Sequence, residues 1–288
     1  MTRPALSFEF FPPKDLPGSF RLWDAVRSLA PFRPEFVSVT YGAGGTTRDL
    51  TRSAVQTLHD STGLAVAGHL TCVDASREET MQVAEEYATA GVRDIVALRG
   101  DAPKGTGGFA QHKDGFAGSL ELIDALAAQD RFNIHVAAYP ETHPEASSRK
   151  ACIDHLKAKF DAGAKSAITQ FFFEADTFLR FRDDCAAAGI TGQIIPGILP
   201  VESWAGVQKF AASCGTHIPQ VIRDGFDHAT RDGTDRLFAT AIAAELCDEL
   251  TTQGVDHLHF YTLNRATLTR DVCHALGYSV QRPLQKVA

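Results

Sequence analysis

An alternation of short apolar runs with helix-type segments repeats eight times along this chain and limits what it can fold into. The runs are rich in β-branched and aromatic residues, and the segments between them show the 3.6-residue apolar period of helices. The expected strands are Ala5–Phe10, Phe36–Thr40, Leu64–Leu70, Asp94–Leu98, Asn133–Tyr139, Ser166–Phe172, Gln193–Ile198 and His257–Tyr261. The expected helices are Ser19–Leu29, Arg48–Ser61, Ser76–Ala90, Ser119–Ala128, Glu145–Ala162, Ala175–Ala188, Ser203–Ala212 and Ala266–Leu276.

Eight such units in one chain predict an α/β fold, a (β/α)8 TIM barrel that forms a single domain over residues 1–288. The stretch from Pro219 to Gln253 adds one or two extra helices before the last strand. A doubly wound sheet is the structural alternative, but it usually has a glycine-rich first turn, and this chain has Phe-Pro-Pro-Lys there. Helix ends agree with the pattern: Ser76 and Glu79 form a capping box, and Gly91, Gly163 and Gly189 suit left-handed C-terminal positions.

Composition excludes several classes of protein. The chain has 28 Lys and Arg against 35 Asp and Glu, a net charge of −7, which argues against a nucleic-acid or anionic-membrane partner. It contains no run of 18 apolar residues and no signal-type N-terminus. Its six cysteines are scattered, as is typical of reduced thiols, so we expect a cytoplasmic location.

Polar residues gather at the carboxyl ends of the expected strands, where barrels of this kind build their active sites. We expect these residues to surround one cavity: Glu9, Thr40, His69, Arg99, Gly100, Asp101, Tyr139, His143, Gln170, Asn264 and Arg265.

Glu9 lies among phenylalanines in Ser-Phe-Glu-Phe-Phe. Loss of solvation there would raise the pKa of its carboxyl group and let it carry a proton near neutral pH. The alternative is a solvated glutamate on a frayed terminal strand. Because a buried, unpartnered carboxylate is costly, we favour a general acid or base.

The other strand-end residues each allow a functional and a structural interpretation. Arg99 could bind an anion, and Asp101 could stabilise a developing cation. The alternative is a local turn in which the two residues form a surface ion pair. Gln170 offers an amide to a heterocycle or caps its strand, and Arg265 binds a carboxylate or forms an ordinary salt bridge. His69 and His143 lack partners at metal-ligand spacing, so no metal site is expected. The residues alone therefore indicate a barrel enzyme with a general acid or base and anion-binding groups.

Eight segments give a more specific result. In order along the chain they are SFEFFPP, FVSVTYGAGG, HLTC, IVALRGD, VAAYPETHPEA, AITQFFF, IIPGILPV and HFYTLNRA. Together, from about Ser7 to Gly277, they closely resemble bacterial methylenetetrahydrofolate reductases. This resemblance implies a flavin-dependent barrel that reduces 5,10-methylenetetrahydrofolate to 5-methyltetrahydrofolate with FAD and with NADH or NADPH. Hydride would pass through flavin N5 in a ping-pong reaction, serving one-carbon metabolism and methionine synthesis.

The resemblance also assigns roles to matching positions. Glu9 matches the general acid that protonates a folate nitrogen, and Asp101 matches a carboxylate that stabilises the resulting iminium ion. Both also count as substrate contacts, together with Gln170, Phe210, Leu263 and Arg265. The positions that match FAD contacts are Thr40, His69, Arg99, Gly100, Asp101, Ala117, Tyr139, His143, Ala146, His155 and Lys159. Lys159, which on its own could be a solvated helix residue, and His143 match the diphosphate contacts.

Two positions depart from the pattern: Gly206 replaces a folate-contacting glutamine, with Gln208 two residues on, and Cys152 replaces an acidic residue near the adenosine. We expect no regulatory domain after the barrel, and therefore no control by S-adenosylmethionine. Relatives assemble as dimers or tetramers, and we expect a homo-oligomer here. The alternatives are a related flavin barrel, such as a proline dehydrogenase-like oxidase, and a folate- or flavin-binding barrel with reduced turnover.

Overall fold

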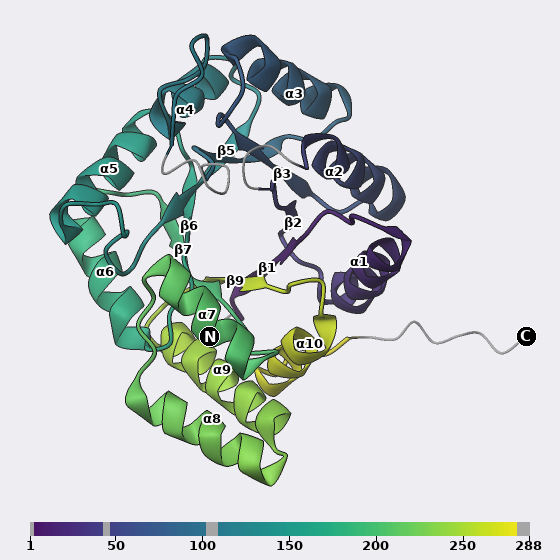
Figure 1. Cartoon of the computed structure of the whole chain (residues 1–288), viewed down its shortest axis with the longest axis vertical. Helices are drawn as coiled ribbons and strands as arrows, with labels where there is room; N and C mark the ends of the chain where they lie inside the picture. Colours follow the sequence, from purple (N-terminus) through teal and green to yellow (C-terminus); the bar gives the residue numbers. More distant parts are fainter. Residues whose placement is uncertain (1–2, 43–46, 102–108, 281–288) are drawn as a thin grey trace, which may run out of the picture.

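The strands form a ring of parallel neighbours at the centre of the molecule (Figure 1). The computed structural model describes residues 3–42, 47–101 and 109–280. Its strands are β1 (Ala5–Phe10), β2 (Phe36–Val39), β3 (Val66–Thr71), β4 (Asp94–Leu98), β5 (Asn133–Ala138), β6 (Ser166–Thr169), β7 (Gln193–Ile195), β8 (Gly197–Ile198) and β9 (His257–Tyr261). Each strand from β1 to β6 pairs with the next one, and β9 pairs with both β1 and β8. The predicted barrel is therefore confirmed.

The expected strand Gln193–Ile198 is interrupted, which corrects the prediction. Pro196 separates β7 from β8, and because proline has no N–H it cannot continue the ladder on that side. β7 pairs with β6, whereas β8 pairs with β9, so the two halves of this strand face different neighbours. The Pro196 carbonyl accepts a hydrogen bond from the His259 N–H at 3.0 Å and helps to close the ring there.

Helices surround the ring (Figure 1). They are α1 (Leu16–Leu29), α2 (Arg48–Thr62), α3 (Arg77–Thr89), α4 (Ser119–Ala127), α5 (Arg149–Asp161), α6 (Ala175–Ala187), α7 (Trp204–Cys214), α8 (Gln220–Asp232), α9 (Asp235–Thr252) and α10 (Ala266–Ala275). α8 and α9 confirm the extra helices expected before the last strand. α5 begins later than predicted because Ser148 caps it, accepting a hydrogen bond from the Ala151 N–H.

The predicted helix ends are present as well. Ser76 and Glu79 form the capping box of α3. Gly91, Gly163 and Gly189 each have a positive φ, between 80° and 116°, directly after a helix. These local signals are readable from sequence because they depend on residues within one turn.

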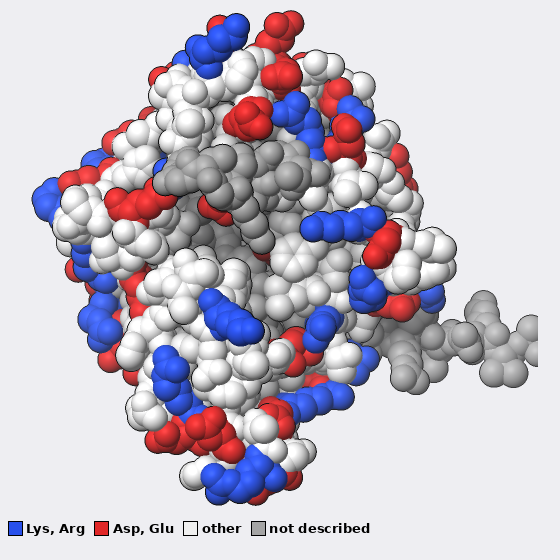
Figure 2. Space-filling model, viewed as in Figure 1, with Lys and Arg blue, Asp and Glu red and all other residues white. Residues whose placement is uncertain are grey.

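Charges are interspersed over the face seen in Figure 2, with basic and acidic side chains next to one another. This distribution agrees with the modest net charge of −7. In the described part of the chain, none of the helices has the length and apolar character needed to cross a membrane.

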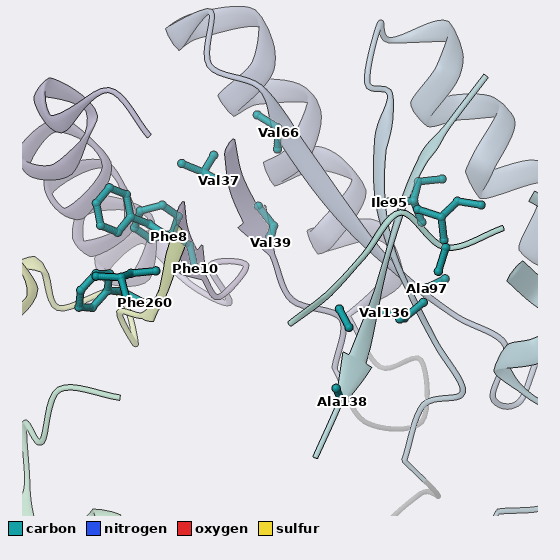
Figure 3. Close-up of a cluster of buried hydrophobic side chains, with 14 of the residues drawn as sticks. Phe8, Phe10, Val37, Val39, Val66, Ile95, Ala97, Val136, Ala138 and Phe260 are labelled. Atoms are coloured by element: carbon teal, nitrogen blue, oxygen red, sulfur yellow. The ribbon is translucent and has the colours of Figure 1, made fainter. Parts of the chain in front are cut away.

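The main core lies between the ring and the helices. Alternate residues of each strand point outward into it, as Figure 3 shows for Phe8 and Phe10 of β1 and Phe260 of β9. The residues between them, such as Ser7 and Glu9, therefore point into the barrel, since side chains alternate along a strand. This alternation decides which side chains reach the site.

Candidate active site

A cavity of about 620 Å³ opens at the carboxyl ends of β1, β3, β4 and β5, on the face that Figure 2 shows as hollowed. Its size is that of a typical site for a small ligand or cofactor. Seven of the predicted strand-end residues line it: Glu9, His69, Arg99, Gly100, Asp101, Tyr139 and His143. Four further positions that match FAD contacts in the family also line it: Ala117, Ala146, His155 and Lys159. The other four predicted strand-end residues, Thr40, Gln170, Asn264 and Arg265, are not among its lining residues, although Tyr41 and Gly42 next to Thr40 are.

Glu9 lies inside the barrel between two histidines. Its Oε2 atom is 3.3 Å from Nε2 of His69 on β3 and 3.8 Å from Nε2 of His259 on β9. Burial alone would raise the pKa of Glu9, but the nearness of the His259 and His69 imidazoles outweighs burial and lowers the pKa to about 2. The expected rise in pKa is therefore wrong: the strand places phenylalanines outward and histidines, not phenylalanines, around the carboxylate.

His259 connects Glu9 to a deeper residue. The Nδ1 atom of its ring lies 2.7 Å from Oγ of Ser7, two residues before Glu9 on the same face of β1. Burial lowers the pKa of His259, partly opposed by Glu9, so a neutral ring is favoured. The ring is hydrogen-bonded at Nδ1 only, and its buried Nε2 makes no hydrogen bond within the described structure but faces the Glu9 carboxylate, so a proton on Nε2 would lie next to Glu9.

Lys159 is buried, so its interpretation as a solvated helix residue is wrong. Its side chain is only 8% exposed, and its ammonium donates a hydrogen bond to the Ala137 carbonyl at 2.8 Å. Burial lowers the pKa of Lys159 to about 8. His143 and His155 line the same part of the cavity, and burial lowers the pKa of both imidazoles. One cation and two imidazole groups there make a suitable site for an anion.

The Arg99–Asp101 segment forms the edge of the cavity. Arg99 pairs with Glu145 at 2.8 Å rather than with Asp101, so the local ion pair considered from sequence is not the one that forms. Asp101 is exposed at the rim. Gly100 has φ +88°, and a Cβ atom there would meet a methyl group of Val73 at 2.5 Å, so glycine is required both by the backbone conformation and by the packing.

Sequence reasoning missed several lining residues, among them Thr71, Tyr41, Ser119 and Tyr261. Thr71 could have been found, because it follows His69 by two residues and shares its face of β3. The buried Thr71 Oγ1 and His69 Nε2 atoms make no hydrogen bond within the described structure. Unsatisfied buried polar atoms in a cavity of this size suit a ligand that carries many polar groups.

The predicted substrate residues beyond Glu9 and Asp101 lie outside this lining, around α7 and the end of β9. Gln170 accepts a hydrogen bond from the Phe171 N–H with its own Oε1 at 3.0 Å. Phe210 on α7 stacks on Phe171 with ring centroids 5.2 Å apart. Leu263 packs against the same apolar cluster, and so does Tyr261, which also lines the cavity. Tyr261 therefore joins the two groups of residues.

Comparison with known proteins gives the family. The family model for methylenetetrahydrofolate reductase matches residues 1–277. The chain belongs to the methylenetetrahydrofolate reductase family. It is 46% identical to the 5,10-methylenetetrahydrofolate reductase of Pectobacterium carotovorum subsp. carotovorum and 45% identical to that of Escherichia coli (strain K12). Each match covers 94% of this chain and 90% of the relative.

A solved structure supports the fold of this methylenetetrahydrofolate reductase family member. An uncharacterized protein from Clostridium thermocellum, described as binding two copies of 5-methyl-5,6,7,8-tetrahydrofolic acid, superimposes with a TM-score of 0.65. The match covers 96% of this chain and 95% of the other at 12% identity, so it shows a shared fold.

The two positions that depart from the family pattern have clear places in the structure. Cys152 lines the cavity, and its sulfur accepts a hydrogen bond from the His143 N–H at 3.4 Å. Gly206 lies in the first turn of α7, where its N–H donates to the capping Ser203 hydroxyl at 3.3 Å. Gly206 and Phe210 are four residues apart and share one face of α7, whereas Gln208 does not. Gln208 therefore does not replace the missing side chain.

Proposed function

We propose that this chain reduces 5,10-methylenetetrahydrofolate to 5-methyltetrahydrofolate, with FAD in the cavity and NADH or NADPH as the reductant. The observation that carries the proposal is the placement of Glu9: a carboxylate inside the barrel, next to two histidines, on the wall of a ligand-sized cavity. Membership of the family indicates which reaction is catalysed. The placement of Glu9 provides a group that can donate the proton which this reaction consumes.

The cavity suits FAD because it combines unsatisfied buried polar atoms with a buried cation. Lys159, His143 and His155 would hold the diphosphate, and His69, Arg99, Gly100 and Tyr139 would contact the rest of the cofactor. Thr40, Asp101, Ala117 and Ala146 complete the proposed contacts. When bound, FAD supplies hydride exchange between the nicotinamide and the folate.

Glu9 provides the proton. Reduction adds a hydride to the methylene carbon and a proton to the nitrogen that leaves when the bridge opens. His259 can pass its Nε2 proton to Glu9 while its Nδ1 takes the proton of the Ser7 hydroxyl, and a proton taken up from solvent replaces that of Ser7. The protonated carboxyl group then donates to the leaving nitrogen, and the Asp101 carboxylate stabilises the iminium ion formed on the substrate.

Both substrates would use the same place in turn, which gives ping-pong kinetics. Gln170 and Phe210 would contact each of them, and Leu263 and Arg265 would contact the folate. The nearness of Phe210 to the Gln170–Phe171 segment supports this grouping. A single catalytic domain over residues 1–288, a homo-oligomeric assembly, a cytoplasmic location and a role in methionine synthesis belong to the same proposal.

The experiment that tests the reaction is anaerobic mixing of FAD-reconstituted protein with 5-methyltetrahydrofolate while the flavin absorbance is followed. Bleaching is expected, because the reverse half-reaction returns hydride to the flavin. Absence of bleaching in protein that binds FAD and is reduced by NADH would contradict folate reduction. Turnover with proline in such protein would instead indicate a proline dehydrogenase-like oxidase.

A further inference from the structure

A row of side chains runs through the barrel from Glu9 to the opposite end. Beyond His259 and Ser7, the Ser7 hydroxyl also contacts Nε2 of His257 at 2.9 Å. The other ring nitrogen of His257, Nδ1, lies 3.4 Å from Oε2 of Glu35. The row therefore continues beyond His259 and Ser7 through His257 and ends at the Glu35 carboxylate.

The row follows the axis of the barrel from its buried centre to the surface. Ser7 and His259 are fully buried and His257 is 1% exposed, whereas the Glu35 side chain is 61% exposed. Glu35 immediately precedes β2 and His257 begins β9, so both lie at the amino-terminal ends of the strands. The cavity lies at the carboxyl ends. The outer end of the row is thus in contact with solvent on the face opposite the substrates.

The chemistry of the proposed reaction creates a need for such a path. Each turnover consumes one proton from solvent, since the nicotinamide delivers only a hydride. Glu9 is ionised in the free protein, so its proton has to arrive during the reaction. The cavity mouth is then occupied by cofactor and folate, which exclude water from that side.

We infer that His257 and Glu35 form the solvent entrance of a proton path that protonates Glu9 from the amino-terminal end of the barrel. This inference rests on the proposed function. It makes His257 and Glu35 positioning and relay residues, because neither touches the substrate.

The transfers balance at every atom. Glu35 takes a proton from solvent and passes it to Nδ1 of His257, whose Nε2 proton moves to the Ser7 oxygen. The Ser7 proton moves to Nδ1 of His259, and the Nε2 proton of His259 moves to Glu9. Each member gains one proton and gives one, and no charge stays in the barrel.

Two features of His257 suit this role. Its Nδ1 atom makes no hydrogen bond within the described structure, so it is free to accept a proton from Glu35. Burial, followed by the effect of His259, lowers the pKa of His257 to about 4, so the neutral ring passes a proton on rather than keeping it. The titratable groups around the ring are Glu35, Asp256, His135 and His259.

The test compares the two half-reactions in stopped-flow experiments on FAD-loaded wild type, His257→Gln and Glu35→Gln. Reoxidation of the reduced enzyme by methylenetetrahydrofolate is expected to slow about 10-fold or more in His257→Gln, with an altered pH profile, because the proton supply is interrupted. Glu35→Gln, at the exposed end, is expected to slow the same step less. Reduction by NADH needs no proton and is expected to keep its wild-type rate.

His135→Gln is the matched control. His135 is buried in the same layer and stacks on Phe36, but it bonds to Ser166 and lies outside the row. A second readout needs no flavin: ring-nitrogen NMR of histidine-labelled protein is expected to show the Nε2–H tautomer of His257 and a change on Glu35→Gln.

The outcomes separate the two proposals. If wild type does not react with folate, the proposed function fails and the path fails with it. If wild type reacts and His257→Gln keeps its rate and pH profile, only the path is overturned. Equal slowing by His135→Gln would also overturn the path, because the effect would then come from barrel packing.

Discussion

The Glu9 carboxylate and the His69 imidazole meet across the mouth of the barrel, with Oε2 and Nε2 3.3 Å apart. They come from β1 and β3, which are separated by β2, so their contact bridges the interior rather than following the sheet. Together with His259, this contact keeps Glu9 ionised until a proton is supplied. The general acid of the proposed reaction is therefore Glu9 together with its histidines.

Replacement of Glu9 by glutamine is expected to separate the two half-reactions. Glutamine keeps the size of the side chain but cannot donate a proton of suitable acidity to the folate nitrogen. The folate half-reaction should slow about 10²–10⁴-fold, the usual contribution of a general acid. Reduction by NADH should stay near the wild-type rate, as measured by anaerobic stopped-flow absorbance. An equal loss in both half-reactions would mean that Glu9 supports the cavity instead of the proton transfer.

Lys159 is expected to control FAD affinity and its dependence on pH. Its pKa is lowered to about 8 by burial, and a bound diphosphate would raise the pKa again. Affinity should therefore be constant below about pH 8 and fall as pH rises above it, since binding then requires uptake of a proton. Lys159→Gln should weaken binding about 10- to 100-fold and remove this pH dependence, as measured by fluorescence titration.

Lys157→Gln provides the control for Lys159. Lys157 lies on the same helix but pairs with Asp161 on the surface. FAD affinity should not change in this variant. A similar loss in both variants would indicate a general effect of charge on α5 and would contradict a diphosphate contact by Lys159.

Much of the fold was predictable because its signals are local. Apolar periodicity and caps such as Ser76–Glu79 depend on residues close in sequence, and β1, β4 and β9 have the predicted bounds. The break in the seventh strand follows from Pro196, which was visible in the sequence. What the sequence did not show is that the residues on either side of Pro196 pair with different neighbours, since pairing is a long-range property.

The residues that form the site were easier to predict than their protonation states. Their positions at strand ends were enough to predict that Glu9, His69 and Asp101 line one cavity. The ionisation of Glu9 was not predictable, because it depends on His259, which is 250 residues away in sequence. His259 lies inside the barrel next to Glu9, whereas the phenylalanines beside Glu9 in sequence point outward. Local composition suggested the opposite direction for its pKa.

Gly197 is expected to be essential for closing the ring. A Cβ atom there would lie 2.1 Å from the Thr169 carbonyl oxygen and 2.6 Å from the Tyr261 ring, and neither backbone nor a buried ring can move freely. Gly197→Ala should lower the free energy of unfolding by about 1–3 kcal/mol or more in urea titrations. Gly118→Ala, with nothing within 4 Å of the added atom, should change it by about 0.5 kcal/mol or less. Similar values for both would contradict tight packing at the closure.

Gly206→Gln is expected to restore a folate contact. Position 206 shares a face of α7 with Phe210, so a glutamine side chain there would lie on the same side as the ring proposed to stack on the substrate. A helix former also replaces glycine, which should stabilise α7 by up to about 1 kcal/mol. Steady-state kinetics should show a lower KM for methylenetetrahydrofolate and an unchanged KM for NADH.

Gly206→Ala separates these two effects, because alanine stabilises the helix without adding an amide. If the alanine variant lowers the KM for folate as much as glutamine does, the gain comes from helix order and not from a contact. If only glutamine lowers it, the amide recognises the folate. An unchanged KM in both variants would place the folate away from this face of α7, and the grouping of Phe210 with Gln170 would then be wrong.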